Sequence, residues 1–260
     1  MTEAWKTLRP ARGLGLLVAA ALALTSAPAR AADLLVAVAA NFLDAAEALE
    51  PGFEASTGHD VAFAAGSTGK LYAQILSGAP YDVFLSADAA RPADLAAQGL
   101  AEPDSVFTYA TGRLALWSAD AARIGPDGAA TLARGDFRTL AIANPELAPY
   151  GLAARETLAA LGLWDAVAPK IVMGQNIGQT FALVATGNAD LGFVALAALR
   201  SPATDAAESG WIVPETLHGP IRQDAALIRR GIGNPAAAAF LDYLQSDEAR
   251  AVIAHFGYGD

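Results

Sequence analysis

The strongest constraint on the fold is a pattern that repeats along the chain: short apolar runs alternate with amphipathic stretches that have the period of a helix. This order is typical of α/β proteins with largely parallel sheets, because a helix returns the chain after each strand, and it disfavours sandwiches and bundles. Strands are expected at 34–40, 61–65, 82–87, 113–119, 139–144, 170–174, 191–196 and 225–230. Helices are expected at about 42–56, 68–77, 91–98, 151–162, 178–187 and 235–255.

Several of the expected strands end at a small or polar residue just before a helix begins. Asn41 follows the first strand, Gly66 and Ser67 follow the second, and Ile177 lies shortly after the strand at 170–174. In open α/β sheets, ligands bind beyond the carboxyl ends of the strands, where helix N-termini converge. Each residue also has an ordinary explanation as a helix cap, but their shared location favours one common site.

The segment "FAAGSTGKLYAQI" at 63–75 looks like a phosphate-binding loop that opens a helix. A P-loop requires a first glycine and a hydroxyl residue after its Gly-Lys pair, and these positions hold Ala64 and Leu71. What remains is a turn of small residues before a helix that begins near Ser67. The turn suits one compact anion better than a triphosphate, although an ordinary capping serine explains it equally well.

The first thirty-one residues have the pattern of a signal peptide. Lys6, Arg9 and Arg12 form a basic region, an apolar run follows at 14–24, and "APARAAD" contains an Ala-x-Ala site for cleavage after Ala31. The run is too short to span a bilayer, and the chain has no cysteine for lipid attachment. We therefore expect export to the periplasm with cleavage, rather than an uncleaved anchor.

The charge and the absence of cysteine exclude several classes of protein. A net charge of −10 argues against nucleic acid or an anionic membrane as a partner. Zero cysteines exclude disulfides and thiolate metal sites. An exported chain of this composition depends on its apolar core alone.

Two alternatives from other classes have little support. An exported hydrolase needs a nucleophile and a base, but nothing places His59, His218 or His255 beside a serine, and no Gly-x-Ser-x-Gly elbow occurs. A metal-ion site at Asp82 and Asp88 fails on distance, because six residues of extended strand separate them by about 20 Å. We expect neither an enzyme nor a direct metal ligand.

Four blocks of the chain resemble one family, the periplasmic molybdate-binding proteins of ABC transporters. They include "GAPYDVFLSAD" within 34–88, "NPELAPYG" within 141–164, "NIGQTFALVATGNADLGFVAL" at 176–196 and the closing helix at 240–258. The resemblance implies an α/β type II periplasmic binding protein with two lobes, each a mixed, mostly parallel sheet flanked by helices. Residues 33–112 and 227–260 would form one lobe, and 113–226 the other.

The resemblance also implies a function and its partners. A protein of this family is expected to capture molybdate, and also tungstate, in the cleft between its lobes and to deliver the anion to the permease of an ABC transporter. It needs no cofactor and works as a monomer. A receptor for sulfate, phosphate or a small organic acid is the alternative within the same class.

The family's oxyanion ligands correspond to Asn41, Ser67, Tyr150 and Ile177 in this chain. The first two would donate from their side chains, and the last two would donate main-chain N–H groups at helix starts. Some members use a tyrosine hydroxyl at the position of Ala195, so another group must replace it here.

None of the four residues is a cation, and Lys70 and Arg155 are expected to reach solvent from the first turns of their helices. Binding would rest on N–H and O–H dipoles fixed by helix ends. A site of donors alone favours a fully deprotonated dianion, because a protonated anion brings an O–H with no acceptor. Molybdate and tungstate meet this condition, and size separates them from sulfate.

Overall fold

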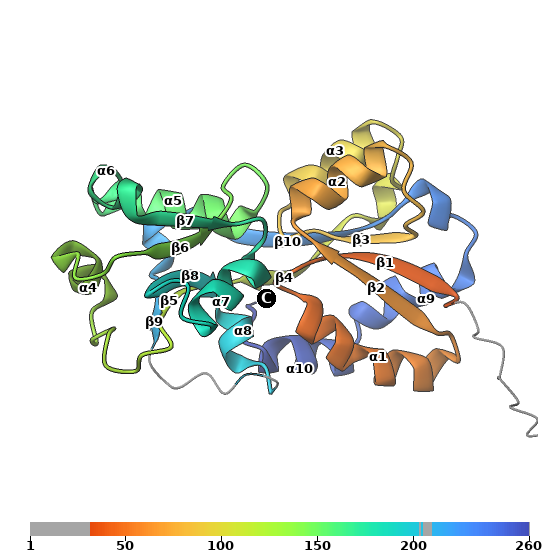
Figure 1. The fold of residues 1–260 in the computed structure, drawn as a ribbon. Coiled ribbons are helices and arrows are strands. Elements are labelled where there is room, and N and C mark those ends of the chain that lie inside the picture. The colour runs from red at the N-terminus through yellow and green to blue at the C-terminus, as the bar shows by residue number, and fades with distance from the viewer. Residues whose placement is uncertain (1–31, 203, 205–209, 260) are drawn as a thin grey trace, which may run out of the picture. The chain divides into compact units, whose positions relative to one another are not determined.

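The strands of the computed structural model form two five-stranded sheets (Figure 1). The structure describes residues 32–202, 204 and 210–259. The predicted signal peptide at 1–31 therefore lies outside the described residues. The first sheet has the order β2-β1-β3-β10-β4 and consists of β1 (Leu34–Ala39), β2 (Val61–Gly66), β3 (Val83–Leu85), β4 (Phe107–Gly112) and β10 (Ile221–Leu227). The second has the order β7-β6-β8-β5-β9 and consists of β5 (Leu114–Trp117), β6 (Leu140–Ala143), β7 (Ile171–Gly174), β8 (Leu191–Ala195) and β9 (Gly210–Ile212).

Both sheets are mixed and are built in the same way. β1 pairs in parallel with β2 and β3, and β10 is antiparallel to β3 and β4. In the second sheet β6 pairs in parallel with β7 and β8, and β5 is antiparallel to β8 and β9. Parallel strands need a helix on each return path, which explains why the helices lie between them in the sequence.

Helices cover both faces of the first sheet, which is why its central strand reads as a continuous apolar run. α1 (Leu43–Thr57), α9 (Pro235–Leu244) and α10 (Asp247–His255) pack on one face, around Val36, Phe53 and Phe240. α2 (Thr68–Leu76) and α3 (Ala90–Ala97) pack on the other, around Ala37 and Phe84. Figure 1 shows these two groups on opposite sides of β1 and β3.

The second sheet is covered in the same manner. α4 (Gly128–Arg134), α5 (Pro149–Ala160) and α6 (Trp164–Val167) contribute to a core that contains Leu116, Ile142 and Phe193. α7 (Ile177–Ala185) and α8 (Leu196–Arg200) pack on the opposite face against Trp117 and Val194. Short 3₁₀ turns complete the chain: η1 (Pro103–Ser105), η2 (Ala168–Lys170), η3 (Glu215–Leu217) and η4 (Arg229–Gly231).

The chain passes between the sheets twice. The first passage falls at Arg113, between β4 and β5. The second comes before β10, whereas the predicted second lobe continued to residue 226. This boundary is corrected because Ile221–Leu227 is a strand of the first sheet, in which Gln223 and Asp224 are buried polar residues that interrupt the apolar pattern.

The predicted closing helix at 235–255 is also corrected, because the structure divides it into α9 and α10. The break falls at Gln245 and Ser246, where the Ser246 hydroxyl accepts a hydrogen bond of 3.2 Å from the Ala249 N–H. A serine followed by two acidic residues is a common helix start, so the sequence itself indicates that a new helix begins here. β4, β9 and α4 are further elements that the apolar pattern did not predict. Within the described residues, no helix is long and apolar enough to cross a membrane.

Candidate functional site

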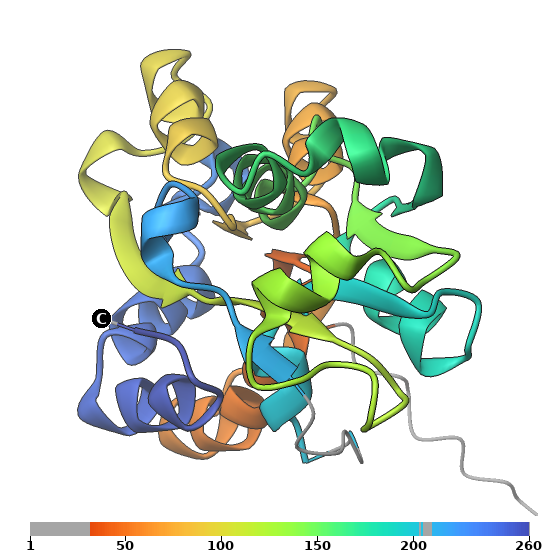
Figure 2. The same cartoon turned by 90° about the vertical axis from the view of Figure 1, so that its left-hand side faces the viewer.

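Figure 2 turns the ribbon by 90° and, with Figure 1, shows the ends of β1 and β2 directed toward the second sheet. A small cavity lies there, lined from both sheets by residues that follow strands or begin helices. They are Ala39, Ala40, Asn41, Gly66, Ser67, Thr68, Ala87, Ala148, Pro149, Tyr150, Asn176 and Ile177. The cavity therefore brings together all four residues that the sequence assigned to the site, which are spread between positions 41 and 177 of the chain.

Ser67 is placed at the cavity by the end of β2 and the start of α2. It is buried, and its Oγ accepts a hydrogen bond of 3.4 Å from the Lys70 N–H, as an N-cap residue does. Accepting this bond leaves the hydroxyl proton free to donate. The Lys70 side chain is exposed and does not line the cavity.

Tyr150 enters the cavity from the first turn of α5, after Pro149 at the N1 position. Its side chain is buried, and its Oη accepts a hydrogen bond of 3.4 Å from the Gln223 Nε2. Burial raises the pKa of Tyr150 well above its ordinary value, although the neighbouring amides of Gln223 and Asn41 act on it in the other direction. Tyr150 therefore keeps its proton at neutral pH and remains an uncharged donor.

Ile177 is the first residue of α7 and is buried against the cavity. Its neighbour Asn176 caps the helix, with Oδ1 accepting a bond of 2.9 Å from the Gln179 N–H. That cap leaves the Ile177 N–H, two positions before Gln179, directed out of the helix end.

Asn41 lines the cavity wall, as expected of a site residue, but its side-chain amide donates to other protein groups. Its Nδ2 donates to the Gln223 Oε1 at 2.8 Å and to the Tyr258 Oη at 3.2 Å. An amide nitrogen carries two protons, so both are used inside the protein. What Asn41 has left to donate is its main-chain N–H.

The main-chain N–H groups of the four residues share one property. Within the described part of the chain, no hydrogen bond is formed by the N–H of Asn41, Ser67, Tyr150 or Ile177. Such groups are unpaired at helix starts, where the helix dipole also gives them partial positive charge. With the hydroxyls of Ser67 and Tyr150, they make six potential donors around one cavity.

The cavity contains no formal charge. None of its lining residues is acidic or basic, and the Arg155 side chain reaches solvent as expected, where it pairs with Glu146 at 3.0 Å outside the cavity. Among the described residues, no three His, Cys, Asp or Glu side chains lie close enough to hold a metal ion. The chemistry of the site is that of neutral N–H and O–H dipoles.

Ala195 lines a second cavity that adjoins the first. This cavity has a volume of about 360 Å³ and shares Ala40, Asn41, Asn176 and Ile177 with it. A methyl group at this position offers no hydroxyl. Tyr150 is the tyrosine that lines the first cavity, and it reaches that cavity from α5.

Sequence reasoning missed the residues that support the site. Thr68 is buried at the cavity, and its Oγ1 accepts a bond of 3.0 Å from the Ala87 N–H, which joins the start of α2 to the segment after β3. Gln223, Tyr109 and Tyr258 form the buried network behind Asn41 and Tyr150. Thr68 could have been predicted from the sequence, because it directly follows Ser67 at the start of the same helix. No pattern in the residues around Gln223 indicates that it supports the site.

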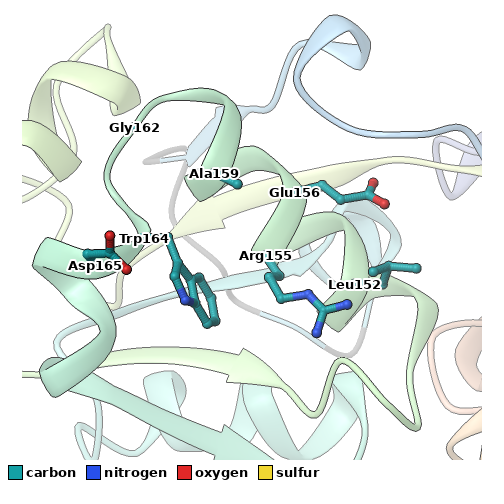
Figure 3. A pocket seen from close by; sticks show the side chains of 7 residues that line it. All are labelled: Leu152, Arg155, Glu156, Ala159, Gly162, Trp164 and Asp165. Carbon is teal, nitrogen blue, oxygen red and sulfur yellow. The ribbon is translucent and has the colours of Figure 1, made fainter.

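A larger cavity on the outer side of α5, of about 490 Å³, lacks these properties. Figure 3 shows its wall, in which the side chains of Arg155 and Trp164 lie near each other between two acidic residues. Arg155 is already paired with Glu146, and Glu156 accepts a hydrogen bond from the Gly219 N–H. Its polar groups do not converge on one point, so it is a weaker candidate for a specific site.

Comparison with known proteins agrees with the fold. Residues 34–259 match the family of bacterial extracellular solute-binding proteins. The chain is 44% identical to the molybdate-binding protein ModA of Rhodobacter capsulatus over 259 residues, which cover 99% of each chain. It is 46% identical to ModA of Azotobacter vinelandii over 244 residues, covering 94% of this chain and 96% of the relative.

A solved structure supports the same relationship. The structure of the periplasmic molybdate-binding protein of Azotobacter vinelandii superposes with a TM-score of 0.84 at 41% identity. The match covers 87% of this chain and 99% of that one.

Proposed function

Because the chain belongs to the family of bacterial extracellular solute-binding proteins, we propose that it captures molybdate and delivers it to an ABC transporter. The observation that carries this proposal is the set of six uncharged donors around one cavity between the two sheets. Four relatives named molybdate-binding proteins support the choice of anion.

Each contact residue has a defined role in the proposal. Ser67 and Tyr150 each donate a main-chain N–H and a hydroxyl proton, and Asn41 and Ile177 each donate a main-chain N–H. The Tyr150 hydroxyl supplies the donor that Ala195 lacks. Asn41 acts through its backbone, since its amide protons are held by Gln223 and Tyr258.

Six donors are enough for tight binding without a cation. Hydrogen bonds to charged groups contribute about 1.5–3 kcal/mol each, which amounts to roughly 9–18 kcal/mol before costs. Association and closure of the lobes consume several kcal/mol. A dissociation constant between about 1 nM and 1 μM is then expected, corresponding to about −12 to −8 kcal/mol.

The absence of acidic acceptors from the cavity lining determines which anions fit. A cavity of donors receives a dianion with four unprotonated oxygens, whereas hydrogen phosphate brings an O–H that needs an acceptor. Tungstate has the same charge and nearly the same size as molybdate, so we include it as a second ligand. Sulfate is smaller and makes longer contacts with donors that are fixed by rigid helix starts.

The wider assignment follows from the same reasoning. The mature protein begins after Ala31, works in the periplasm as a monomer without a cofactor, and transfers the anion to an inner-membrane permease. Two lobes built on the two sheets close around the anion, with boundaries at Arg113 and in the segment between β9 and β10. Binding rather than catalysis is the activity.

One experiment tests the function directly. Purified mature protein is heated with a panel of molybdate, tungstate, sulfate, phosphate and small organic acids, and the unfolding temperature is recorded. A ligand at a hundred times its dissociation constant adds about 2.7 kcal/mol of stability. Molybdate and tungstate should raise the unfolding temperature, and titration calorimetry then measures their affinity; a response to sulfate or phosphate alone would refute the proposal.

A further inference from the structure

We propose that Gln223 is a positioning residue that turns the hydroxyl proton of Tyr150 into the oxyanion cavity, through a relay that begins at Tyr258 and runs through Asn41. The inference rests on the proposed function, because it concerns how one of the anion's donors is set. The four side chains come from the C-terminal segment, the turn after β1, strand β10 and helix α5. All four are buried.

The first step is fixed by Tyr258. Its Oη lies 2.6 Å from the main-chain oxygen of Asn41, which can only accept a hydrogen bond. The single hydroxyl proton of Tyr258 is therefore committed to that oxygen. The Asn41 side-chain atom 3.2 Å from the same Oη must then be a donor, which identifies it as Nδ2.

The second step passes from Asn41 to Gln223. The Asn41 Nδ2 lies 2.8 Å from one end of the Gln223 amide, and two amide nitrogens cannot hydrogen-bond to each other. That end of Gln223 is therefore Oε1. The Tyr109 Oη also lies near Oε1, at 3.2 Å, and near the main-chain oxygen of Ser86, at 3.0 Å, so its proton has an acceptor at either position.

The third step reaches the cavity. With Oε1 turned toward Asn41, the Nε2 of Gln223 lies 3.4 Å from the Tyr150 Oη and donates to it. The Tyr150 oxygen then receives a hydrogen bond from behind. Its own proton is directed away from Gln223, toward the cavity that Tyr150 lines.

Close packing supports this geometry. A Cβ built on Gly112 would lie 2.2 Å from the Tyr150 Oη and 2.7 Å from the Gln223 Nε2. The absence of a side chain at Gly112 lets both polar atoms approach the end of β4. The position where the chain first passes between the sheets is therefore part of the support for Tyr150.

A double-mutant cycle tests whether Gln223 acts through Tyr150. Molybdate affinity is measured by calorimetry for the wild type, Gln223→Met, Tyr150→Phe and the double variant, with unfolding temperature as a check on folding. Each single change should weaken binding about tenfold or more, since a hydrogen bond to a charged ligand is lost. The double variant should be little weaker than Tyr150→Phe, because residues in one network are not additive.

The outcomes separate the two proposals. If the wild type binds molybdate but the two losses multiply, Gln223 does not act through Tyr150 and the relay is refuted. If the wild type does not bind molybdate, the proposed function itself fails. If Gln223→Met does not fold, Tyr258→Phe replaces it, because this change removes the first hydrogen bond of the relay. The effects of Tyr258→Phe and Tyr150→Phe on molybdate affinity must then also be non-additive.

A pH profile distinguishes positioning from simple packing. In Gln223→Glu, a carboxylate accepts the Tyr150 proton and repels the anion, whereas the protonated carboxyl donates as the amide does. Molybdate affinity of this variant should rise at least tenfold from pH 9 to pH 6, while that of the wild type stays constant. An equal, pH-independent loss would overturn the relay.

The other titratable groups around Gln223 are three tyrosines and three acidic residues. Burial raises the pKa of Tyr109, Tyr150 and Tyr258, so all three stay neutral up to pH 9. The adjacent Asp224 accepts a hydrogen bond of 2.7 Å from the Thr108 hydroxyl. The charges of Asp88 and Asp44 act on Tyr109 and Tyr258, respectively.

Discussion

The main-chain N–H of Gly69, in the first turn of α2, donates a hydrogen bond of 2.9 Å to the main-chain oxygen of Leu147, in the loop before α5. This bond joins the two halves of the chain beside the cavity, two residues from Ser67. A second contact reinforces it, because Arg91 donates to the main-chain oxygen of Glu146 at 3.3 Å while pairing with Asp88. In the Gly69–Leu147 contact, two backbone groups approach each other without an intervening side chain.

Gly69→Ala should weaken anion binding without weakening the fold. The new Cβ would lie 3.1 Å from the Leu147 oxygen, so the two loops must move apart by a few tenths of an ångström, while alanine suits a helix better than glycine. We expect molybdate to bind about three- to tenfold more weakly, the effect of one lost hydrogen bond. Calorimetry measures the loss, and stopped-flow fluorescence should show faster release.

Gly125→Ala is the matched control for Gly69→Ala, since nothing lies within 4 Å of its Cβ. It should leave affinity unchanged. Equal affinity in both variants would mean that the Gly69–Leu147 contact has no part in closure.

Ser67→Ala should weaken molybdate binding at least tenfold, because it removes a hydroxyl donor to the anion. It also removes a helix cap, which costs about 1 kcal/mol of stability. Ser246→Ala separates the two effects, because Ser246 caps α10 in the same way but does not line the cavity. The control should lose stability and keep its affinity; unchanged affinity in Ser67→Ala would remove Ser67 from the site.

Lys70→Gln should change molybdate affinity by less than about twofold. The side chain is exposed and lies outside the cavity wall, and charges in water are screened over about 10 Å at 0.1 M salt. Titration at two salt concentrations checks this. A large loss of affinity would show that a cation contributes to binding, which contradicts the neutral site.

Gly112→Ala should displace the Tyr150 hydroxyl and lower affinity about tenfold or more. The added methyl group overlaps Tyr150 Oη at 2.2 Å, and overpacking of this kind costs roughly 1–3 kcal/mol of stability. The variant that combines Gly112→Ala with Tyr150→Phe relieves part of the overlap and should be more stable than Gly112→Ala alone, as urea unfolding would show. Equal stability of Gly112→Ala and the double variant would show that the strain does not arise from contact with the Tyr150 hydroxyl.

Stability should fall at alkaline pH because of the three buried tyrosines. Burial is the main cause of the raised pKa values of Tyr109, Tyr150 and Tyr258, so above about pH 10 the unfolded chain holds fewer protons than the folded one. The stabilisation is complete below pH 10 and is lost as pH rises through the folded pKa, by up to 1.4 kcal/mol per pH unit for each tyrosine. Urea unfolding between pH 8 and pH 11 measures the slope.

Tyr258→Phe removes one of the three groups and serves as the comparison for the alkaline titration. The variant should lose less stability between pH 10 and pH 11 than the wild type. Equal slopes would show that Tyr258 ionises in the folded state as easily as in the unfolded one.

Most strands and helices were predictable because their signals are local. β1, β6 and β8 lie between helical layers and read as apolar runs, and α2 begins at a serine cap. The predicted start of β10 lies four residues after the observed start, because Gln223 and Asp224 interrupt the apolar pattern of this strand. Their burial is offset by hydrogen bonds to Asn41, Tyr150 and Thr108, which lie far away in the sequence.

By itself, the sequence determined the order of the elements, the helix starts at which Ser67, Tyr150 and Ile177 stand, and the resemblance to a family of oxyanion receptors. Only the tertiary structure decided which atoms face the cavity. It turned the Asn41 amide away to Gln223 and Tyr258, 182 and 217 residues along the chain, and left its N–H at the site. The physical reason is that caps and periodicity arise between near neighbours, whereas the direction of a buried proton depends on acceptors that folding alone brings together.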